Sequence, residues 1–260
     1  MTRVRSRFFI VTLSIAILII SASVTKAQNA DPSLILSLSF DDGSGKIAKD
    51  GSNYGNDGDL KGDPKWVEGK FDKALEFNGT SDFVEIPHAD ILTVDKEVTV
   101  MAWIKTDRYE VPGAGYQGIV SKSDSPRSYS LYTTSSGVLH FSTAGVGTTS
   151  IKQVPKNEWV HITAVVVDGK HRYYFNGILD TETGSGIKLP GLSDTATALV
   201  GKTHEGSREF KGIIDEVRIW NKALSADEIV KQMDKGGKTV SVQPNGRLVA
   251  TWAQIKNILF

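Results

Sequence analysis

The residues best suited to binding a metal ion are acidic and lie close together near residue 50. Asp41 and Asp42 end an apolar stretch, and a glycine-rich segment at residues 50–59 adds further aspartates and asparagines. Oxygen ligands on flexible turns suit Ca²⁺, which accepts about six to eight of them. The spacing is not that of an EF-hand loop. By spacing alone, an ordinary Asn- and Asp-rich turn is the favoured interpretation.

Residues that could support hydrolysis or nucleotide binding do not form a familiar pattern. The five histidines are scattered singly, the chain has no cysteine, and no Gly-x-Ser-x-Gly or His-Glu-x-x-His motif occurs. Residues 113–118 match Gly-x-Gly-x-x-Gly by letters, but Pro112 precedes them and a strand-like segment follows. A dinucleotide site needs a strand before this motif and a helix after it. The sequence therefore predicts a flexible loop at residues 113–118.

The first 27 residues have the pattern of a secretory signal peptide. Arg3, Arg5 and Arg7 precede an apolar run at residues 8–20, and small residues follow. The run is shorter than the ~20 residues of a membrane-spanning helix, although an uncleaved anchor is the alternative. Cleavage would leave 26 basic against 30 acidic residues, a net charge of −4. We expect a secreted protein, extracellular or periplasmic, with no stable membrane span and no affinity for nucleic acid.

Short strand-like segments separated by glycine-rich turns make up the remaining sequence from residue 33 onward. Residues 34–40 alternate apolar and polar side chains, and residues 98–104 are bulky on both faces, which is typical of a central strand. Turn pairs such as Asp168-Gly169 and Asn176-Gly177 predict hairpins. Many strands without intervening helices indicate an antiparallel sandwich of two sheets.

One short helix is predicted near the end of the strand-rich region. Ser225 and Glu228 form a capping box, and Ile229, Val230 and Met233 are the expected buried stripe. We expect one domain over residues 33–235 and a tail over residues 236–260. The apolar segment at residues 248–252 either docks as an extra strand or stays loose.

Several segments taken in order resemble laminin-G-like jelly-roll domains of the concanavalin A-like lectin and glucanase superfamily. Each segment is weakly diagnostic alone, whereas their number and order carry the resemblance. It implies an all-β, antiparallel two-sheet jelly-roll sandwich with one short C-terminal helix. The matching segments are residues 40–45, 50–58, 74–79, 83–87, 98–104, 159–163, 174–177 and 212–225.

The resemblance also bears on metal binding and catalysis. Related domains often hold one structural Ca²⁺, and the corresponding ligands here would be Asp42 and Asp215, with Asp50 as a looser candidate. The alternative is that Asp215 only accepts hydrogen bonds from turn amides. Related glucanases carry a Glu-x-Asp-x-x-Glu pattern, and no glutamate of this chain begins one. We therefore expect a protein without glycosidase activity.

The predicted function is a secreted, non-catalytic recognition or adhesion module that binds a glycan or a glycoprotein surface. Sugar sites use aromatic platforms and planar polar groups. Packing within the sandwich is the alternative role for such residues. A structural or protein–protein interaction module of the cell envelope is the alternative function, and a glycoside hydrolase is less favoured. The candidate ligand-binding residues are Tyr109, Tyr116, Arg127, Tyr129, Tyr132 and His140.

Overall fold

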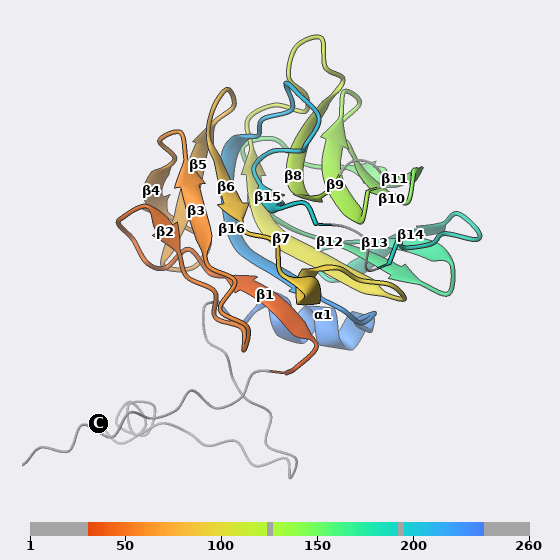
Figure 1. Ribbon diagram of the computed structural model, residues 1–260. Coiled ribbons are helices and arrows are strands. Elements are labelled where there is room, and N and C mark those ends of the chain that lie inside the picture. The colour runs from red at the N-terminus through yellow and green to blue at the C-terminus, as the bar shows by residue number, and fades with distance from the viewer. Residues whose placement is uncertain (1–30, 124–126, 192–194, 237–260) are drawn as a thin grey trace, which may run out of the picture.

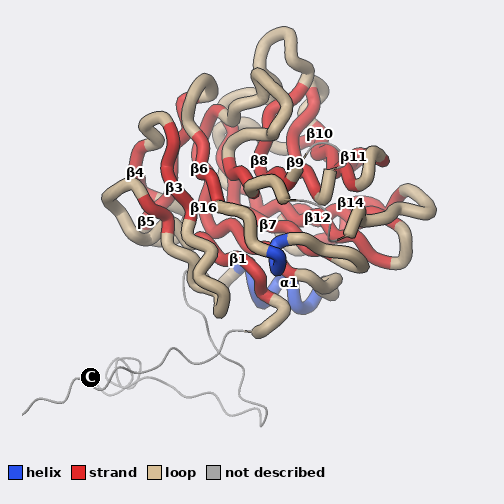
Figure 2. Tube along the Cα trace, viewed as in Figure 1, coloured by secondary structure: helices blue, strands red, loops and turns tan. Residues whose placement is uncertain are grey.

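Two antiparallel β-sheets pack against each other in the computed structural model (Figure 1), which describes residues 31–123, 127–191 and 195–236. The signal-peptide prediction for residues 1–27 and the apolar tail segment at residues 248–252 lie outside the described residues. Figure 2 shows the strands as two layers with little helix. The predicted all-β sandwich with one short C-terminal helix is confirmed.

The first sheet has the order β14-β13-β12-β7-β16-β5-β4, and β1 also pairs with β16. Its strands are β1 (Leu34–Leu38), β4 (Lys65–Glu68), β5 (Lys73–Asn78), β7 (Val98–Thr106), β12 (Val160–Val167), β13 (Lys170–Phe175), β14 (Ile178–Thr183) and β16 (Lys211–Trp220).

The second sheet has the order β11-β10-β9-β8-β15-β6-β3-β2. Its strands are β2 (Ile47–Ala48), β3 (Gly58–Lys61), β6 (Phe83–Ile86), β8 (Tyr116–Lys122), β9 (Tyr129–Thr134), β10 (Val138–Thr143), β11 (Val146–Gln153) and β15 (Ala198–Val200). A short 3₁₀ helix, η1 (Asp90–Leu92), follows β6. Because β8 begins at Tyr116, the loop predicted at residues 113–118 is wrong for residues 116–118, which belong to the strand, and the motif leads into a strand and not into a helix.

Burial of both faces explains the central strands. Every residue of β12 is buried, and β7 lies between β12 and β16 as the pattern at residues 98–104 predicts. The side chains between the sheets form one core that includes Leu36, Phe77 and Phe141. The hairpin pairs also behave as expected, since φ is positive at both Asn176 (49°) and Gly177 (78°).

The helix α1 (Ala226–Met233) lies against the outer face of the first sheet. Ser225 accepts a hydrogen bond from the Glu228 amide, and the Glu228 carboxylate accepts one from the Ser225 amide at 2.8 Å, so the predicted capping box is confirmed. Ile229 is buried, but Val230 is 40% exposed, so the predicted apolar stripe is wrong at that position. No helix in the described ranges combines the length and the apolar character needed to cross a bilayer.

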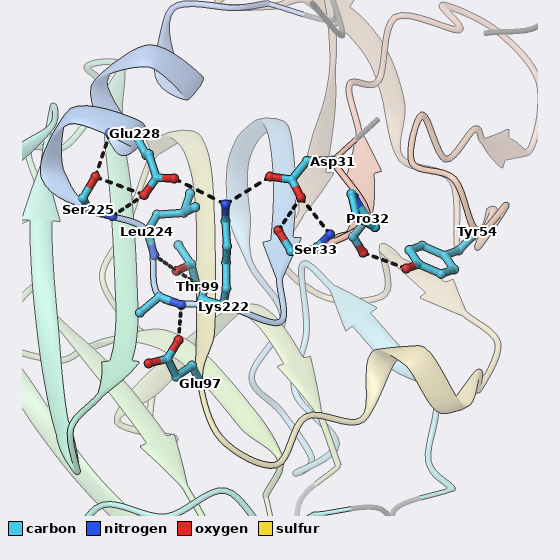
Figure 3. A network of polar contacts seen from close by, with 11 residues as sticks. Asp31, Pro32, Ser33, Tyr54, Glu97, Thr99, Lys222, Leu224, Ser225 and Glu228 are labelled. Atoms are coloured by element: carbon cyan, nitrogen blue, oxygen red, sulfur yellow. Dashed lines mark hydrogen bonds and ion pairs between the residues drawn. The ribbon is translucent and has the colours of Figure 1, made fainter. Parts of the chain in front are cut away.

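A lysine ties this helix to the first residues that the structure describes (Figure 3). The Lys222 ammonium lies 3.0 Å from Asp31 and 3.3 Å from Glu228. The Thr99 hydroxyl accepts a hydrogen bond from the Leu224 amide at 3.0 Å, and the Glu97 carboxylate accepts one from the Ala223 amide at 2.9 Å. These contacts fix the segment between β16 and α1 over the end of β7.

Two histidines are buried in the strands of the first sheet. Burial lowers the pKa of His171 to about 4 and that of His161 to about 3. The His171 ring is within hydrogen-bond distance of the Thr148 hydroxyl (2.9 Å) and the Thr143 hydroxyl (3.3 Å). Both histidines are therefore neutral in the folded protein at pH 7.

Because the pKa values of these histidines are low in the folded protein, we expect the protein to lose stability in mild acid. Between pH 6.5 and about 4, the unfolded chain holds a proton on His171 that the folded protein does not hold. The free energy of unfolding therefore falls as the pH drops through this window, by up to about 1.4 kcal/mol per pH unit for one fully protected histidine. Urea unfolding should show a shallower pH dependence for His171→Gln than for the wild type. Parallel pH profiles for the two proteins would contradict the prediction.

Candidate functional site

A hollow of about 230 Å³ opens on the face of the second sheet that points away from the core. Alternation along β10 explains this placement: Leu139 and Phe141 enter the core, so His140 and Ser142 face outward. Loops from three other parts of the chain complete the wall. We call this hollow the pocket, and it is lined by Tyr116, Arg127, Tyr132, His140, Ser142, Gly145, Gly147 and Arg208.

Three rings from neighbouring strands form an aromatic platform in the pocket. His140 on β10 is paired with Tyr132 on β9, and their rings stack with centroids 4.7 Å apart and planes 11° from parallel. Tyr116 on β8 meets the edges of both rings at 5.0 and 5.8 Å. Gly147 is required beside the platform, because a Cβ there would lie 2.1 Å from His140 Nε2.

Two arginines and one glutamate flank the platform. Arg127 and Arg208 each form an ion pair with a different oxygen of Glu205. Arg127 Nη1 also donates to the Ser142 hydroxyl at 3.2 Å. The Arg208 guanidinium carbon lies 4.7 Å from the centre of the Tyr116 ring, a cation–π distance. The arginines are thus held against the platform on one side of the pocket.

The electrostatic state of the rings follows from burial. Burial, together with the nearby charges of Arg127 and Arg208, lowers the pKa of His140 to about 4. Burial raises the pKa of the Tyr132 phenol above its ordinary value of 10. At neutral pH the platform is therefore uncharged, and the charges of the pocket come from its arginines and Glu205.

The structure brings together four of the six predicted ligand-binding residues: Tyr116, Arg127, Tyr132 and His140. Tyr129 does not reach the pocket. It lies three residues before Tyr132 on the same strand, faces the core, and donates to the Leu92 carbonyl at 3.0 Å.

Tyr109 also lies outside the pocket lining. Its ring contacts the position of Gly137, and Lys156 Nζ lies 4.7 Å from its centre.

Sequence reasoning missed Ser142, Glu205 and Arg208. Ser142 carried a signal, since it lies two residues from His140 on the same face. The other two are in a loop far along the chain, where no local pattern marks them.

Asp42 and Asp50, two of the three predicted calcium ligands, stabilise local turns. Asp50 accepts hydrogen bonds from the amides of Ser37 (2.9 Å), Ser52 (2.9 Å) and Asn56 (2.8 Å). Asp42 accepts one from the Lys49 amide at 3.0 Å. Within the described part of the chain, no group of three or more His, Cys, Asp or Glu side chains is arranged to hold a metal ion.

Asp215 has a different environment, on the first sheet. Its Oδ2 accepts from the amides of Lys70 (2.9 Å) and Phe71 (3.1 Å), whereas its buried Oδ1 has no partner among the described residues. Burial, together with the nearby Glu216 and Asp41 carboxylates, raises the pKa of this carboxyl to about 8.

Backbone oxygens gather beside this carboxylate. A Cβ placed on Gly69 would lie 2.7 Å from Asp215 Oδ2, 2.5 Å from the Phe71 carbonyl and 2.8 Å from the Lys73 carbonyl, so these three oxygens surround one point. The oxygen of Asp215 beside these carbonyls is Oδ2, which already accepts two amides, and the unpartnered oxygen of the same carboxylate is Oδ1. Carboxylate and carbonyl oxygens are ligands of Ca²⁺, so Asp215 and the carbonyls of Phe71 and Lys73 are the groups that would hold an ion here.

A bulge in β16 produces this arrangement. The register of β16 against β7 shifts between Asp215 and Arg218, and Glu216 adopts a positive φ of 53°. Glu216 and Arg218 are both buried and form an ion pair with each other. Arg218 Nη1 also donates to the Gln232 carbonyl of α1 at 2.7 Å, which anchors the helix.

Comparison with known proteins agrees with this architecture. Over 154 residues the chain is 25% identical to part of the adhesion G-protein coupled receptor V1 of Danio rerio, which covers 54% of this chain and 2% of the receptor. Domain 4 of AbnA, a GH43 extracellular arabinanase from Geobacillus stearothermophilus solved with arabinotriose, has a TM-score of 0.61 at 20% identity. That likeness covers 79% of this chain and 99% of the domain.

The binding domain of Paraclostridial Mosquitocidal Protein 1 has a TM-score of 0.62 at 18% identity, over 76% of this chain and 51% of that one. The chain thus spans a small part of the receptor and about half of the toxin domain. Residues 78–230 match the family described as the concanavalin A-like lectin/glucanases superfamily. With its two antiparallel sheets and this match over more than half of its length, the chain belongs to the concanavalin A-like lectin/glucanase superfamily.

Proposed function

We propose that this protein is a non-catalytic recognition module that binds glycans or glycosylated surfaces in the pocket. The observation that carries the proposal is the aromatic platform of Tyr116, Tyr132 and His140 with two guanidinium groups beside it. Sugars present apolar C–H faces and planar sets of hydroxyls, which such a combination recognises. The arabinanase domain that shares the fold was solved with arabinotriose, which is further support.

The test is a glycan array followed by calorimetry on the glycans that bind. Tyr116→Ala removes the half-buried tyrosine ring of the platform and is expected to weaken binding about tenfold or more, because one aromatic contact is worth about 1.5 kcal/mol. Tyr54→Ala is the matched control, since Tyr54 is exposed and outside the pocket lining. A blank array would overturn the proposal and favour a structural or protein–protein interaction module of the cell envelope. Unchanged binding by Tyr116→Ala would remove the pocket from the proposal.

The carboxylate content of the pocket supports a function without glycoside hydrolysis. Glycosidases use two carboxyl groups about 5 to 9.5 Å apart. Around the pocket, the described residues place one carboxylate, Glu205, and both of its oxygens are paired with arginines. Hydrolysis of a bound oligosaccharide by the purified protein would overturn this part of the proposal.

We also propose that the protein is exported, to the cell exterior or the periplasm. The support is the charged, apolar and small-residue order of residues 1–27 together with the adhesion receptor and the extracellular arabinanase among its relatives. N-terminal sequencing of protein recovered outside the cytoplasm should begin at Gln28. An intact N-terminus would indicate an uncleaved anchor.

We propose, in addition, a structural calcium ion held by Asp215 and the carbonyl oxygens of Phe71 and Lys73. The support is the unpartnered, buried Oδ1 of Asp215 and the convergence of oxygens around Gly69. Asp41 and Glu216, whose charges act on Asp215, are further acidic groups in this region. Because Asp215 and the pocket belong to different sheets, the ion would act on stability and not on ligand contact.

A further inference from the structure

We propose that the pocket accepts a single sugar residue that carries a carboxylate group, at the end of a glycan. This inference rests on the proposed function and adds the ligand class. Uronic acids and sialic acids share the required chemistry. The observations that carry it are the unpartnered Nε donor of Arg127, the charge balance around the two pocket arginines, and the size of the hollow.

The arginines have more hydrogen-bond donors than the pocket has acceptors. Each guanidinium carries several N–H groups in a planar fork that matches a carboxylate. Arg127 Nε is buried and has no acceptor among the described residues. Arg208 lines the pocket and donates to Glu205 through Nη1. A buried donor without a partner, such as Arg127 Nε, is rare, and a ligand oxygen is one way to satisfy it.

The charge balance also favours an anion. Arg127 and Arg208 share the single carboxylate of Glu205, so this side of the pocket keeps one positive charge in excess. The side chains of these three residues are only 22%, 18% and 21% exposed, so water screens the excess charge poorly. His140 adds no charge, because it is neutral at pH 7.

The dimensions of the site fit one sugar residue. The hollow of about 230 Å³ is smaller than the ~300–1,000 Å³ typical of pockets for larger ligands. A sugar ring that contacts the half-buried Tyr116 and His140 can direct a carboxylate toward the arginines, because the Arg208 guanidinium carbon is 4.7 Å from the centre of the Tyr116 ring. Tyr132 is 2% exposed and supports His140 by stacking against it. The aromatic platform would thus bind the sugar face, and the arginines would select the acid.

The experiment compares matched acidic and neutral sugars with the full mature chain by calorimetry. One arm uses a disaccharide ending in glucuronic acid against the same disaccharide ending in glucose, and the second arm uses sialyllactose against lactose. We expect at least tenfold tighter binding of the acidic member in one arm, which identifies the type of acid. The preference should decrease with added salt, since it is electrostatic.

Two variants connect the preference to the arginines. Arg208→Gln keeps a planar polar group but removes a charge, so the ratio of acidic to neutral affinity is expected to fall about tenfold. Glu205→Gln removes the competing carboxylate, so the same ratio is expected to rise. Lys46→Gln, which changes an exposed lysine paired with Asp63 on the surface, is the control and should leave the ratio unchanged.

The outcomes separate this inference from the proposed function. Equal binding of acidic and neutral sugars that Tyr116→Ala still weakens would overturn the acid preference and leave the glycan-binding proposal standing. A preference that neither Arg208→Gln nor Glu205→Gln changes would also overturn it. Failure of every glycan on the array and of both pairs to bind would overturn the proposed function and this inference together.

Discussion

Replacing Arg218 by methionine is expected to lower the free energy of unfolding by about 3–5 kcal/mol. Arg218 and Glu216 are 5% and 2% exposed, and they form an ion pair beneath α1. Methionine retains much of the volume but removes the cation that pairs with the buried Glu216 carboxylate. It also removes the hydrogen bond to the Gln232 carbonyl that holds the helix against the sheet. Urea unfolding followed by circular dichroism measures the loss.

The control for this prediction is an ion pair at the surface. Arg172 pairs with Glu182, and their side chains are 32% and 30% exposed, so Arg172→Met is expected to cost less than about 1 kcal/mol. The double variant Arg218→Met with Glu216→Gln should recover part of the lost stability, because it also removes the buried negative charge of Glu216. Similar losses for the buried and the surface variants would contradict the interpretation of Glu216 as a buried carboxylate dependent on Arg218.

Replacing Asp215 by asparagine is expected to abolish the response of the melting temperature to calcium. If the proposed ion binds, calcium at about 100 times its dissociation constant stabilises the wild type by about 2.7 kcal/mol, which raises the melting temperature by roughly 5–10 °C. In chelator the variant should be no less stable than the wild type, because Asp41 and Glu216 both disfavour a charge on Asp215. Thermal unfolding in calcium and in chelator measures both effects.

Asp50→Asn is the matched control, since Asp50 holds turn amides. It is expected to lower the melting temperature by the same amount in calcium and in chelator. A calcium response that Asp215→Asn leaves intact would place any ion elsewhere. A response lost in Asp50→Asn would restore Asp50 as a ligand, as the sequence resemblance implies.

The central strands and the helix could be predicted from the sequence because their signals are local. Alternation of apolar and polar residues predicts β1, and bulky residues on both faces predict β7. A strand-like apolar run predicts β12, and the Ser225 capping box predicts α1. The edge strands β11 and β14 had no such signal. Most of their side chains are exposed on both faces, so no apolar alternation distinguishes them from loops.

The candidate site was predictable only within the strands that cross it. Tyr132 and His140 belong to neighbouring strands that a hairpin pattern identifies, whereas Tyr129 was misplaced because its strand face was not considered. Arg208 and Glu205 reach the pocket from a loop after β15. Their role depends on contacts across more than 70 residues of sequence, as the Arg127–Glu205 pair shows.

The same distinction applies to the acidic residues. Local turn chemistry at Asp50 is visible in the sequence, since a carboxylate among Asn, Gly and Ser accepts nearby amides. The environment of Asp215 is not visible, because it is made by amides and carbonyls about 145 residues earlier.

The sequence by itself determined the sandwich and the outward face of its strands, because side chains alternate with a period of two. Only the tertiary structure decided which loops meet over that face, because long-range packing brings them together.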